Sequence, residues 1–318
     1  MTQTPQLILP TRGAPAAHER PLHRTRRRLS SPWATVAAVV LAVVWTIPTF
    51  GLFISSFRPP ADITTSGWWT AFTNPQFTLE NYINTLNFND TITVGESFIN
   101  SLTISIPATF FPIAIALMAA YAFAWIDFRG KDALFIAVFA LQVVPLQMAL
   151  VPLLSLYSNG LTLFGVQIFS GLDLNGLSSS FAQVWMSHTM FALPLAIFIL
   201  HNSVAAIPSD VIEAAKMDGA GHGQMFFRVV LPLSMPAIAA FAIFQFLWVW
   251  NDLLVATIFA PGENAPITKL LTDLSGTYGQ QWYLLSAGTF LGIIVPLIVF
   301  FALQRFFVRG LLAGATKG

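Results

Sequence analysis

The sequence predicts an all-α membrane protein, folded as a polytopic bundle of six transmembrane helices. Of its 318 residues, 55% are hydrophobic and only 9% are charged, whereas about a quarter of the residues in a soluble domain are charged. The mean hydropathy is +0.69. The chain contains no cysteine, which excludes disulfides, thiolate metal sites and cysteine nucleophiles.

Six apolar segments are each long enough to cross a bilayer, which takes about 20 helical residues. The polar residues before them, 1–31, are predicted to form a disordered basic cytoplasmic arm, and residues 32–318 a single transmembrane domain. A basic start before an apolar run is also typical of a signal peptide, but the length of this run favours an uncleaved span. The predicted spans cover about residues 33–57, 97–126, 133–157, 181–206, 235–260 and 283–307.

The basic residues predict the orientation of the chain, because cytoplasmic loops carry an excess of lysine and arginine. Of the 15 Lys and Arg residues, all but Arg58 and Lys269 fall in four segments. These are the N-terminal arm, the 127–132 turn, the polar segment between spans four and five, and the C-terminus. Both termini and the polar segment are therefore predicted to be cytoplasmic, which requires an even number of spans.

The polar segment Pro208–Pro236 interrupts the apolar second half of the chain and is predicted to form a helix–turn–helix along the membrane surface. Asp210 and Glu213 have the spacing of a capping box, so a first helix should cover about 211–217 and end at the glycines that follow. A second helix, about 224–230, should end before the next prolines. Any topology requires a polar loop here, so an ordinary solvated linker is the alternative.

The segment contains Glu213-Ala214-Ala215, then Gly219, then Val229-Val230-Leu231-Pro232. This pattern resembles the EAA loop, which marks the membrane subunits of bacterial ATP-binding-cassette (ABC) importers. The usual motif has isoleucine at the position of Val229. From the first span to the C-terminus, the chain looks most like the maltose-type second permease subunit of the sugar-importer branch. The residues that carry the resemblance are Glu213-Ala214-Ala215, Asp218-Gly219-Ala220, Val229-Val230-Leu231-Pro232, Trp250-Asn251-Asp252 and the tail from Gln304 to Gly318.

The resemblance implies a type I ABC importer fold in which the loop at 208–234 is seated on an ATPase subunit. In that family the glutamate bonds to the ATPase, the alanines and glycine allow close packing, and the aspartate would cap or hydrogen-bond nearby. The implied partners are a homologous second permease, two ABC ATPases and an extracytoplasmic sugar-binding protein, assembled at the bacterial cytoplasmic membrane. The residues assigned to coupling are Glu213, Ala214, Ala215, Asp218, Gly219, Leu231 and Pro232.

The chain itself is predicted not to be an enzyme and to hold no cofactor or metal. No G-x-x-x-x-G-K-[ST] phosphate loop occurs, so ATP and magnesium should be bound by the partner ATPase. The G-x-S-x-G and H-E-x-x-H patterns of hydrolases are also missing, which makes an intramembrane enzyme a weak alternative. A secondary transporter would need a coupling carboxylate near the midplane or internal repeats, and the sequence shows neither.

Polar side chains inside predicted spans are the candidates for the substrate path, because such groups are costly in lipid and usually face a cavity or another helix. A lone histidine such as His188 is more often hydrogen-bonded to a neighbouring helix than a ligand. Asp252 is predicted to lie in the outer half of span five, where a packing or interfacial role is the favoured interpretation. The candidates are Gln142, Gln147, His188, Asn251 and Asp252, together with Trp248, whose ring beside Asn251 and Asp252 suits stacking on a sugar. An ABC importer for a non-sugar solute is the main alternative function.

Overall fold

The computed structural model describes residues 32–88, 92–169, 179–274 and 281–315. Contacts divide the chain into two compact units, residues 1–51 and residues 52–318. The predicted arm, residues 1–31, lies outside the described residues. The first described helix is α2 (Pro32–Ser56), which contains no charged residue and is long enough to span a bilayer.

The unit that begins at Leu52 is built almost entirely from helices, which confirms the predicted all-α, polytopic class. Its main helices are α5, α8, α11 and α14. Along the chain its elements are α3 (Pro60–Thr65), η1 (Trp68–Phe72), α4 (Glu80–Leu86), α5 (Val94–Trp125), α6 (Lys131–Ala140), η2 (Leu141–Val143), α7 (Leu146–Asn159), β1 (Leu161–Leu163), β2 (Val166–Phe169), α8 (Ser179–Ala205), α9 (Ser209–Met217), α10 (His222–Met225), η3 (Phe226–Val230), α11 (Leu231–Trp250), α12 (Leu254–Phe259), η4 (Gly262–Asn264), α13 (Ile267–Leu274) and α14 (Trp282–Ala315).

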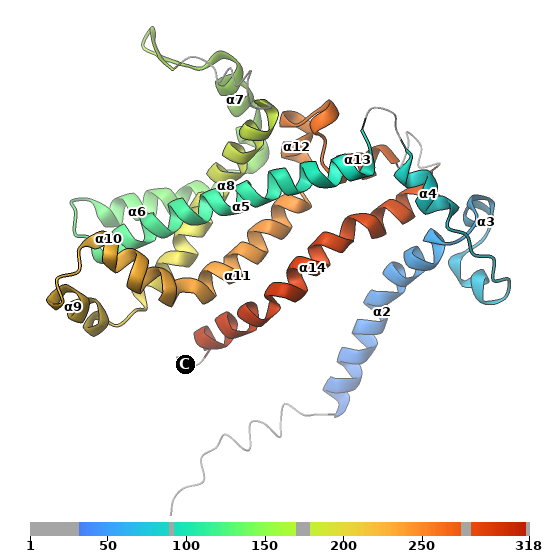
Figure 1. Ribbon diagram of the computed structural model, residues 1–318, viewed down its shortest axis with the longest axis horizontal. Helices are drawn as coiled ribbons and strands as arrows, with labels where there is room; N and C mark the ends of the chain where they lie inside the picture. The colour runs from blue at the N-terminus through green and yellow to red at the C-terminus, as the bar shows by residue number, and fades with distance from the viewer. Residues whose placement is uncertain (1–31, 89–91, 170–178, 275–280, 316–318) are drawn as a thin grey trace, which may run out of the picture. The chain divides into compact units, whose positions relative to one another are not determined.

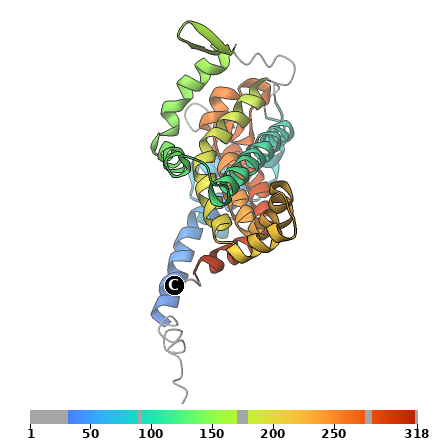
Figure 2. The ribbon, with the colours of Figure 1, turned by 90° about the vertical axis from the view of Figure 1, so that its left-hand side faces the viewer.

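The long helices of this unit pack side by side. Helix α5 lies along α8 and α11, and α11 also packs against α14 (Figure 1). Helices α9 and α10 lie at one end of this group and α12 and α13 at the other, while α7 and its hairpin extend away from α11 and α14 (Figures 1 and 2). Helix α5 thus connects the two ends of this group of helices.

Five described helices are long and apolar enough to span a membrane, and a sixth span results only if a bent pair counts as one. The bent pair is Lys131–Val143 with Leu146–Asn159, whose axes differ by 101°. The predicted third span, 133–157, is therefore divided between two helices that meet at a sharp bend. Proline disfavours helical backbone in the residue before it, and Val144 accordingly has an extended conformation ahead of Pro145.

The predicted fifth span, 235–260, also differs from the structure at both ends. Helix α11 begins at Leu231 and ends at Trp250, so Asp252 does not lie within the span. Instead, Oδ2 of Asp252 accepts hydrogen bonds from the backbone N–H groups of Val255 (3.0 Å) and Ala256 (3.1 Å) in the first turn of α12. A carboxylate that satisfies these N–H groups favours a new helix start at this point.

The predicted outer loop at about 158–180 contains an antiparallel hairpin, β1–β2, although part of it, 170–178, lies outside the described residues. Phe164 and Gly165 connect the strands and both have positive φ, +51° and +79°. Two residues of positive φ match the twist of a two-residue hairpin. The hairpin is a small exception to the all-α prediction.

The predicted outer loop that starts at Arg58 folds around this arginine, whose side chain is buried with 3% exposure. Its guanidinium donates to the carbonyls of Asp62 (3.1 Å) and Ser66 (3.2 Å) and to the hydroxyls of Ser66 (2.6 Å) and Thr70 (3.0 Å). Asn81 in α4 donates to the carbonyl of Arg58 over 2.8 Å. The segment is therefore a folded unit held by internal polar contacts.

Candidate coupling surface and translocation pathway

Helix α9 exposes most of its side chains. Ile212 is its single buried residue at 1% exposure, and it belongs to the large apolar cluster formed with α5, α8 and α11. Glu213 and Ala214 are exposed, while Ala215 is half-buried. Within the described residues, the carboxylate of Glu213 makes no hydrogen bond or ion pair. One side chain thus anchors α9, and the remaining surface is available to another molecule.

The start of α9 differs from the prediction. Pro208 is the N-cap, the helix begins at Ser209, and no side chain caps it. The predicted capping box of Asp210 and Glu213 is therefore wrong, because proline ends the preceding helix and its fixed φ lets the new one start two residues before the expected position. Asp210 instead lies in the first turn, where a negative charge favours the helix dipole.

The end of α9 follows the prediction, because Gly219 terminates it. Gly219 has φ +81°, its N–H bonds to the carbonyl of Lys216, and the N–H of Ala220 bonds to the carbonyl of Ala215, both over 3.0 Å. This pair of bonds is a Schellman motif. A Cβ at Gly219 would meet no atom within 4 Å, so glycine is required by conformation rather than by space. Asp218, at the C-cap, is exposed.

The second arm of the segment continues into a span rather than stopping as predicted. Helix α10, the π-helical turn η3 and α11 follow one another without a break, so the helix runs through Pro232 and Pro236. In η3 the N–H of Leu231 bonds to the carbonyl of Phe226, five residues back. Proline cannot form the usual helical hydrogen bond, and the wider π-turn accommodates Pro232 directly after it.

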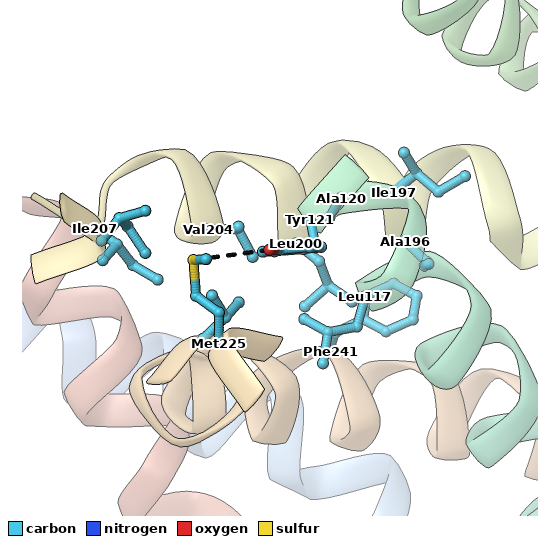
Figure 3. Packing of buried hydrophobic residues seen from close by; sticks show 13 residues of the cluster. Leu117, Ala120, Tyr121, Ala196, Ile197, Leu200, Val204, Ile207, Met225 and Phe241 are labelled. Carbon is cyan, nitrogen blue, oxygen red and sulfur yellow. Dashed lines mark hydrogen bonds between the residues drawn. The ribbon is translucent and has the colours of Figure 1, made fainter. Parts of the chain in front are cut away.

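The carboxyl end of α5 holds this second arm. The hydroxyl of Tyr121 shares a 2.8 Å hydrogen bond with Nδ1 of His222. It also lies 3.7 Å from the sulfur of Met225, the contact marked by the dashed line in Figure 3. Trp125 donates its indole N–H to the carbonyl of Val204 near the end of α8, over 3.3 Å. The arm is thereby fixed to two long helices of the bundle.

Two residues at this end were not indicated by any sequence pattern. Tyr121 was hidden in an apolar run, and only its proximity to His222 reveals its contact with the segment. Met217 is 87% exposed at the tip of α9, although methionine is usually buried. An exposed, flexible thioether next to the motif residues suits an adaptable apolar contact. The polar pattern of the segment indicates neither of these residues.

Three of the predicted path residues come together. Nε2 of His188, on α8, lies 3.7 Å from Oδ2 of Asp252, and the ring of His188 meets that of Trp248 in a T-shaped contact with centroids 5.8 Å apart. His188 is buried at 1% exposure, and neither ring nitrogen has a hydrogen-bond partner among the described residues. Spacing along the sequence could not predict this meeting of α8 with the residues that follow α11.

Of the remaining three path residues, Asn251 and Gln147 lie apart, whereas Gln142 lines a cavity with Trp248. Asn251 is exposed, and its amide donates to the carbonyl of Leu247 in its own helix over 2.7 Å. Gln147 is exposed on α7 and is not among the residues that line the cavity beside it. Gln142, in η2, lines a cavity of about 420 Å³ between the α6–α7 break and the side chains of Phe191 and Trp248. The structure thus retains Gln142 and Trp248 as cavity residues.

Comparisons with known proteins agree with this architecture. The family described as "Binding-protein-dependent transport system inner membrane component" matches residues 112–312. The osmoprotective compounds uptake permease protein GgtD of Synechocystis sp. is 51% identical over 89% of this chain and 91% of its own. The alpha-glucoside transport system permease protein AglG of Rhizobium meliloti is 49% identical over 79% of this chain and 63% of its own.

A solved structure shares the fold. It is that of a bacterial ABC transporter involved in the import of the acidic polysaccharide alginate. The superposition covers 90% of this chain and 99% of the matched chain, with a TM-score of 0.60. The sequence identity is 18%, so this likeness concerns the fold alone. The same kind of transporter has also been solved in complex with an alginate pentasaccharide-bound periplasmic protein, at a TM-score of 0.58 and 17% identity over 91% of this chain and 98% of the matched one.

Proposed function

The chain belongs to the family of binding-protein-dependent transport system inner membrane components, and from that premise we propose that it is the permease subunit of an ATP-driven sugar importer. The observation that carries this proposal is α9, a polar helix anchored by Ile212 alone and exposed elsewhere. A helix that leaves its surface unpaired in the isolated chain is suited to contact with a second protein. The chain contributes the membrane pathway, and the energy comes from an ATPase partner.

The residues of the EAA-like motif are assigned complementary roles at that contact. Glu213 forms a hydrogen bond or ion pair with the ATPase, while Ala214 and Ala215 allow its backbone to approach closely. Gly219 reverses the chain after α9, and Asp218 at the C-cap hydrogen-bonds nearby. Leu231 and Pro232, at the π-turn, join the arm to α11.

The orientation follows from the charges together with the packing. Trp125, at the end of α5, is hydrogen-bonded near the end of α8, so the 127–132 turn and α9 lie at the same end of the bundle. In that turn Asp127 pairs with Lys131 over 2.9 Å, which lowers the pKa of Asp127. Both segments carry basic residues, so this end is assigned to the cytoplasm of a bacterial cell and the end with Arg58 to the outside.

The substrate is assigned as a sugar, most specifically a glucoside. GgtD takes up osmoprotective compounds and AglG transports alpha-glucosides, and both share about half of their aligned residues with this chain. The partners that such an importer requires are a second permease, two ABC ATPases and an extracytoplasmic sugar-binding protein. The alginate transporter solved with a periplasmic protein supports the last of these by analogy of fold.

Purification of the tagged chain from its native membranes tests the proposal. A second permease and an ABC ATPase are expected to copurify and to be identified by mass spectrometry. In proteoliposomes, the complex with its binding protein is expected to take up labelled maltose, trehalose or sucrose, three neutral α-glucosides, only when ATP is supplied. Recovery of a lone chain that moves solute without ATP, or a complex that imports only non-sugar solutes, would overturn it.

A further inference from the structure

Trp248 differs from the other tryptophans that pack within the bundle. The indole N–H of Trp248 has no hydrogen-bond partner in the part of the chain that the structure describes. The others each bond to a backbone carbonyl of another helix and so have a structural role. These bonds run from Trp125 to Val204 (3.3 Å), from Trp185 to Thr103 (2.8 Å) and from Trp250 to Gly292 (3.2 Å).

The same contrast separates the two glutamines near this tryptophan. Gln245 is buried at 1% exposure and donates its amide to the carbonyl of Ala108 over 3.1 Å, tying α11 to α5. The amide of Gln142 is exposed and makes no hydrogen bond to any described residue. The fold therefore uses Gln245 and the three hydrogen-bonded tryptophans, whereas Gln142 and Trp248 keep donors without a partner among the described residues.

The two unpaired side chains line the same space. Gln142 and Trp248 both border the cavity of about 420 Å³ and an adjoining one of about 140 Å³, with Phe191 as the third shared residue. The wall of the larger cavity includes the extended backbone at Val144 and Pro145, where α6–η2 bends by 101° into α7. Non-helical backbone at membrane depth is tolerated where it borders a polar cavity or is buried in protein.

The lining selects a chemical class of ligand. Neither cavity has an aspartate, glutamate, lysine or arginine among its lining residues. An aromatic face, an amide that both donates and accepts, and an indole N–H suit a neutral molecule with an apolar ring face and several hydroxyls. A charged ligand would be left without a counter-ion here. The volume lies within the range of small-molecule sites.

We propose that Trp248 and Gln142 form a sugar subsite in this chain, where Trp248 stacks on a neutral pyranose ring and Gln142 binds its hydroxyls. The ring of His188 contacts that of Trp248 in a T-shaped arrangement, and its Nε2 lies 3.7 Å from Oδ2 of Asp252. His188 is thereby a positioning residue for the indole. This inference rests on the proposed function. It adds that this subunit contacts the sugar directly and that the contact excludes acidic sugars.

The natural absence of cysteine provides a direct test. In the purified complex, Gln142→Cys should react with a water-soluble thiol reagent, measured by mass spectrometry of this chain. Maltose, trehalose or sucrose, whichever the wild-type complex imports, should slow the reaction severalfold, and glucuronate should not. Ser155→Cys, on an exposed part of α7 outside both cavities, is the matched control and should react equally with and without sugar.

Substitutions of tryptophan separate ligand contact from packing. Trp248→Leu should raise the sugar concentration for half-maximal uptake by about tenfold, the loss of one favourable contact, while Trp248→Phe retains most of the stacking and should change it less. Trp185→Leu breaks the bond to Thr103 and should lower the yield of folded complex without changing that concentration. His188→Gln should shift the concentration in the same direction as Trp248→Leu, to a smaller extent.

The outcomes distinguish this inference from the proposed function. A wild-type complex that imports no sugar refutes the proposed function and this subsite with it. If the complex imports sugar but sugar leaves the reaction of the Gln142→Cys variant unchanged, the subsite alone is refuted. If the introduced thiol of that variant fails to react with or without sugar, the second permease or lipid fills the cavity, which also refutes the subsite.

Discussion

Two hydrophilic segments at opposite ends of the helical unit use their polar residues in opposite ways. In the segment from Arg58 to Asn81, the side chains of Arg58 and Asn81 turn inward and bond to the chain's own carbonyls and hydroxyls. In the segment around α9, Glu213 points outward without a partner among the described residues. Two polar segments of the sequence therefore differ in the structure. At one end of the unit polar side chains bond within the chain, and at the other end the acidic side chain on α9 is open to another molecule (Figure 1).

The difference follows from what each segment offers its own polar groups. The outer segment supplies carbonyls and hydroxyls within reach of a buried guanidinium, which lowers the cost of removing the charge from water. On α9, the carboxylate of Glu213 has no hydrogen-bond donor among the described residues, so it remains in water. Folding alone therefore satisfies Arg58, whereas it leaves Glu213 open to another molecule.

The largest expected effect comes from reversing a charge on the exposed surface. Glu213→Lys should abolish ATP-driven sugar uptake, because it places a repelled charge at the proposed ATPase contact, while the amount of chain in the membrane stays unchanged. Uptake in proteoliposomes and quantitative immunoblotting measure the two quantities. Glu80→Lys, an exposed acid in the outer segment, is the control and should leave uptake nearly unchanged. Sugar uptake at the wild-type rate by the Glu213→Lys variant would contradict the proposed difference between the two polar segments.

The second effect tests the inward-facing segment. Arg58→Ala should lower the free energy of unfolding by about 3 kcal/mol, since it leaves buried acceptors without their donor. Lys269→Ala removes the other outer basic residue, whose ion pair with Asp273 is on the surface, and should cost less than about 1 kcal/mol. Thermal unfolding followed by circular dichroism gives both values, and equal losses would refute the distinction between buried and surface cations.

A smaller effect is expected from the turn after α9. Gly219→Ala forces a Cβ into a left-handed conformation at a cost of about 1–2 kcal/mol, so uptake should fall by about tenfold as α9 loses its position. Gly221, with φ −74° and open space around it, accepts alanine without strain. Gly221→Ala should leave the initial rate of sugar uptake unchanged. A loss of uptake as large as that of Gly219→Ala would show that the space around these glycines, rather than the backbone conformation, decides the effect.

The smallest effect concerns the link between bundle and surface. Tyr121→Phe removes the hydrogen bond to His222, worth about 1 kcal/mol, and should raise the amount of ATP hydrolysed per sugar transported. Tyr157→Phe removes a similar bond, 3.0 Å to Ser187, away from α9. It should reduce thermal stability without changing the ATP-to-sugar ratio. An unchanged ratio in the Tyr121 variant would mean that the apolar contacts of α10 suffice for coupling.

Much of the fold was predictable because it depends on local pattern. Long apolar segments predicted the spans, and Gly219 predicted the end of α9 since only glycine adopts that conformation at little cost. Predictions that depended on competing local signals were less successful. Asp210 and Glu213 had capping-box spacing, but Pro208 already started the helix. The proline at 232 suggested a stop, but a π-turn allowed the helix to continue.

The candidate site was predictable as a set of residues but not as an arrangement. Polarity within apolar runs singled out Gln142 and His188, because such groups are costly in lipid. The polar residues Asn251 and Asp252 that follow Trp248 singled out this tryptophan as a stacking aromatic. Nothing in their spacing showed that His188 would meet Trp248 or that Gln142 and Trp248 would share a cavity. Those contacts join different helices, and the position of Gln142 beside Trp248 depends on the 101° bend after η2.

The sequence by itself determined the fold class, the number of apolar segments, the polar surface helix and the family. These follow from composition, segment length and short motifs, which act over a few residues of chain. Only the tertiary structure decided that Arg58 is buried, that Tyr121 holds His222 and that Trp248 keeps its N–H unpaired among the described residues. Each of these depends on which distant side chains meet, because a polar group is satisfied or left open by its neighbours in space.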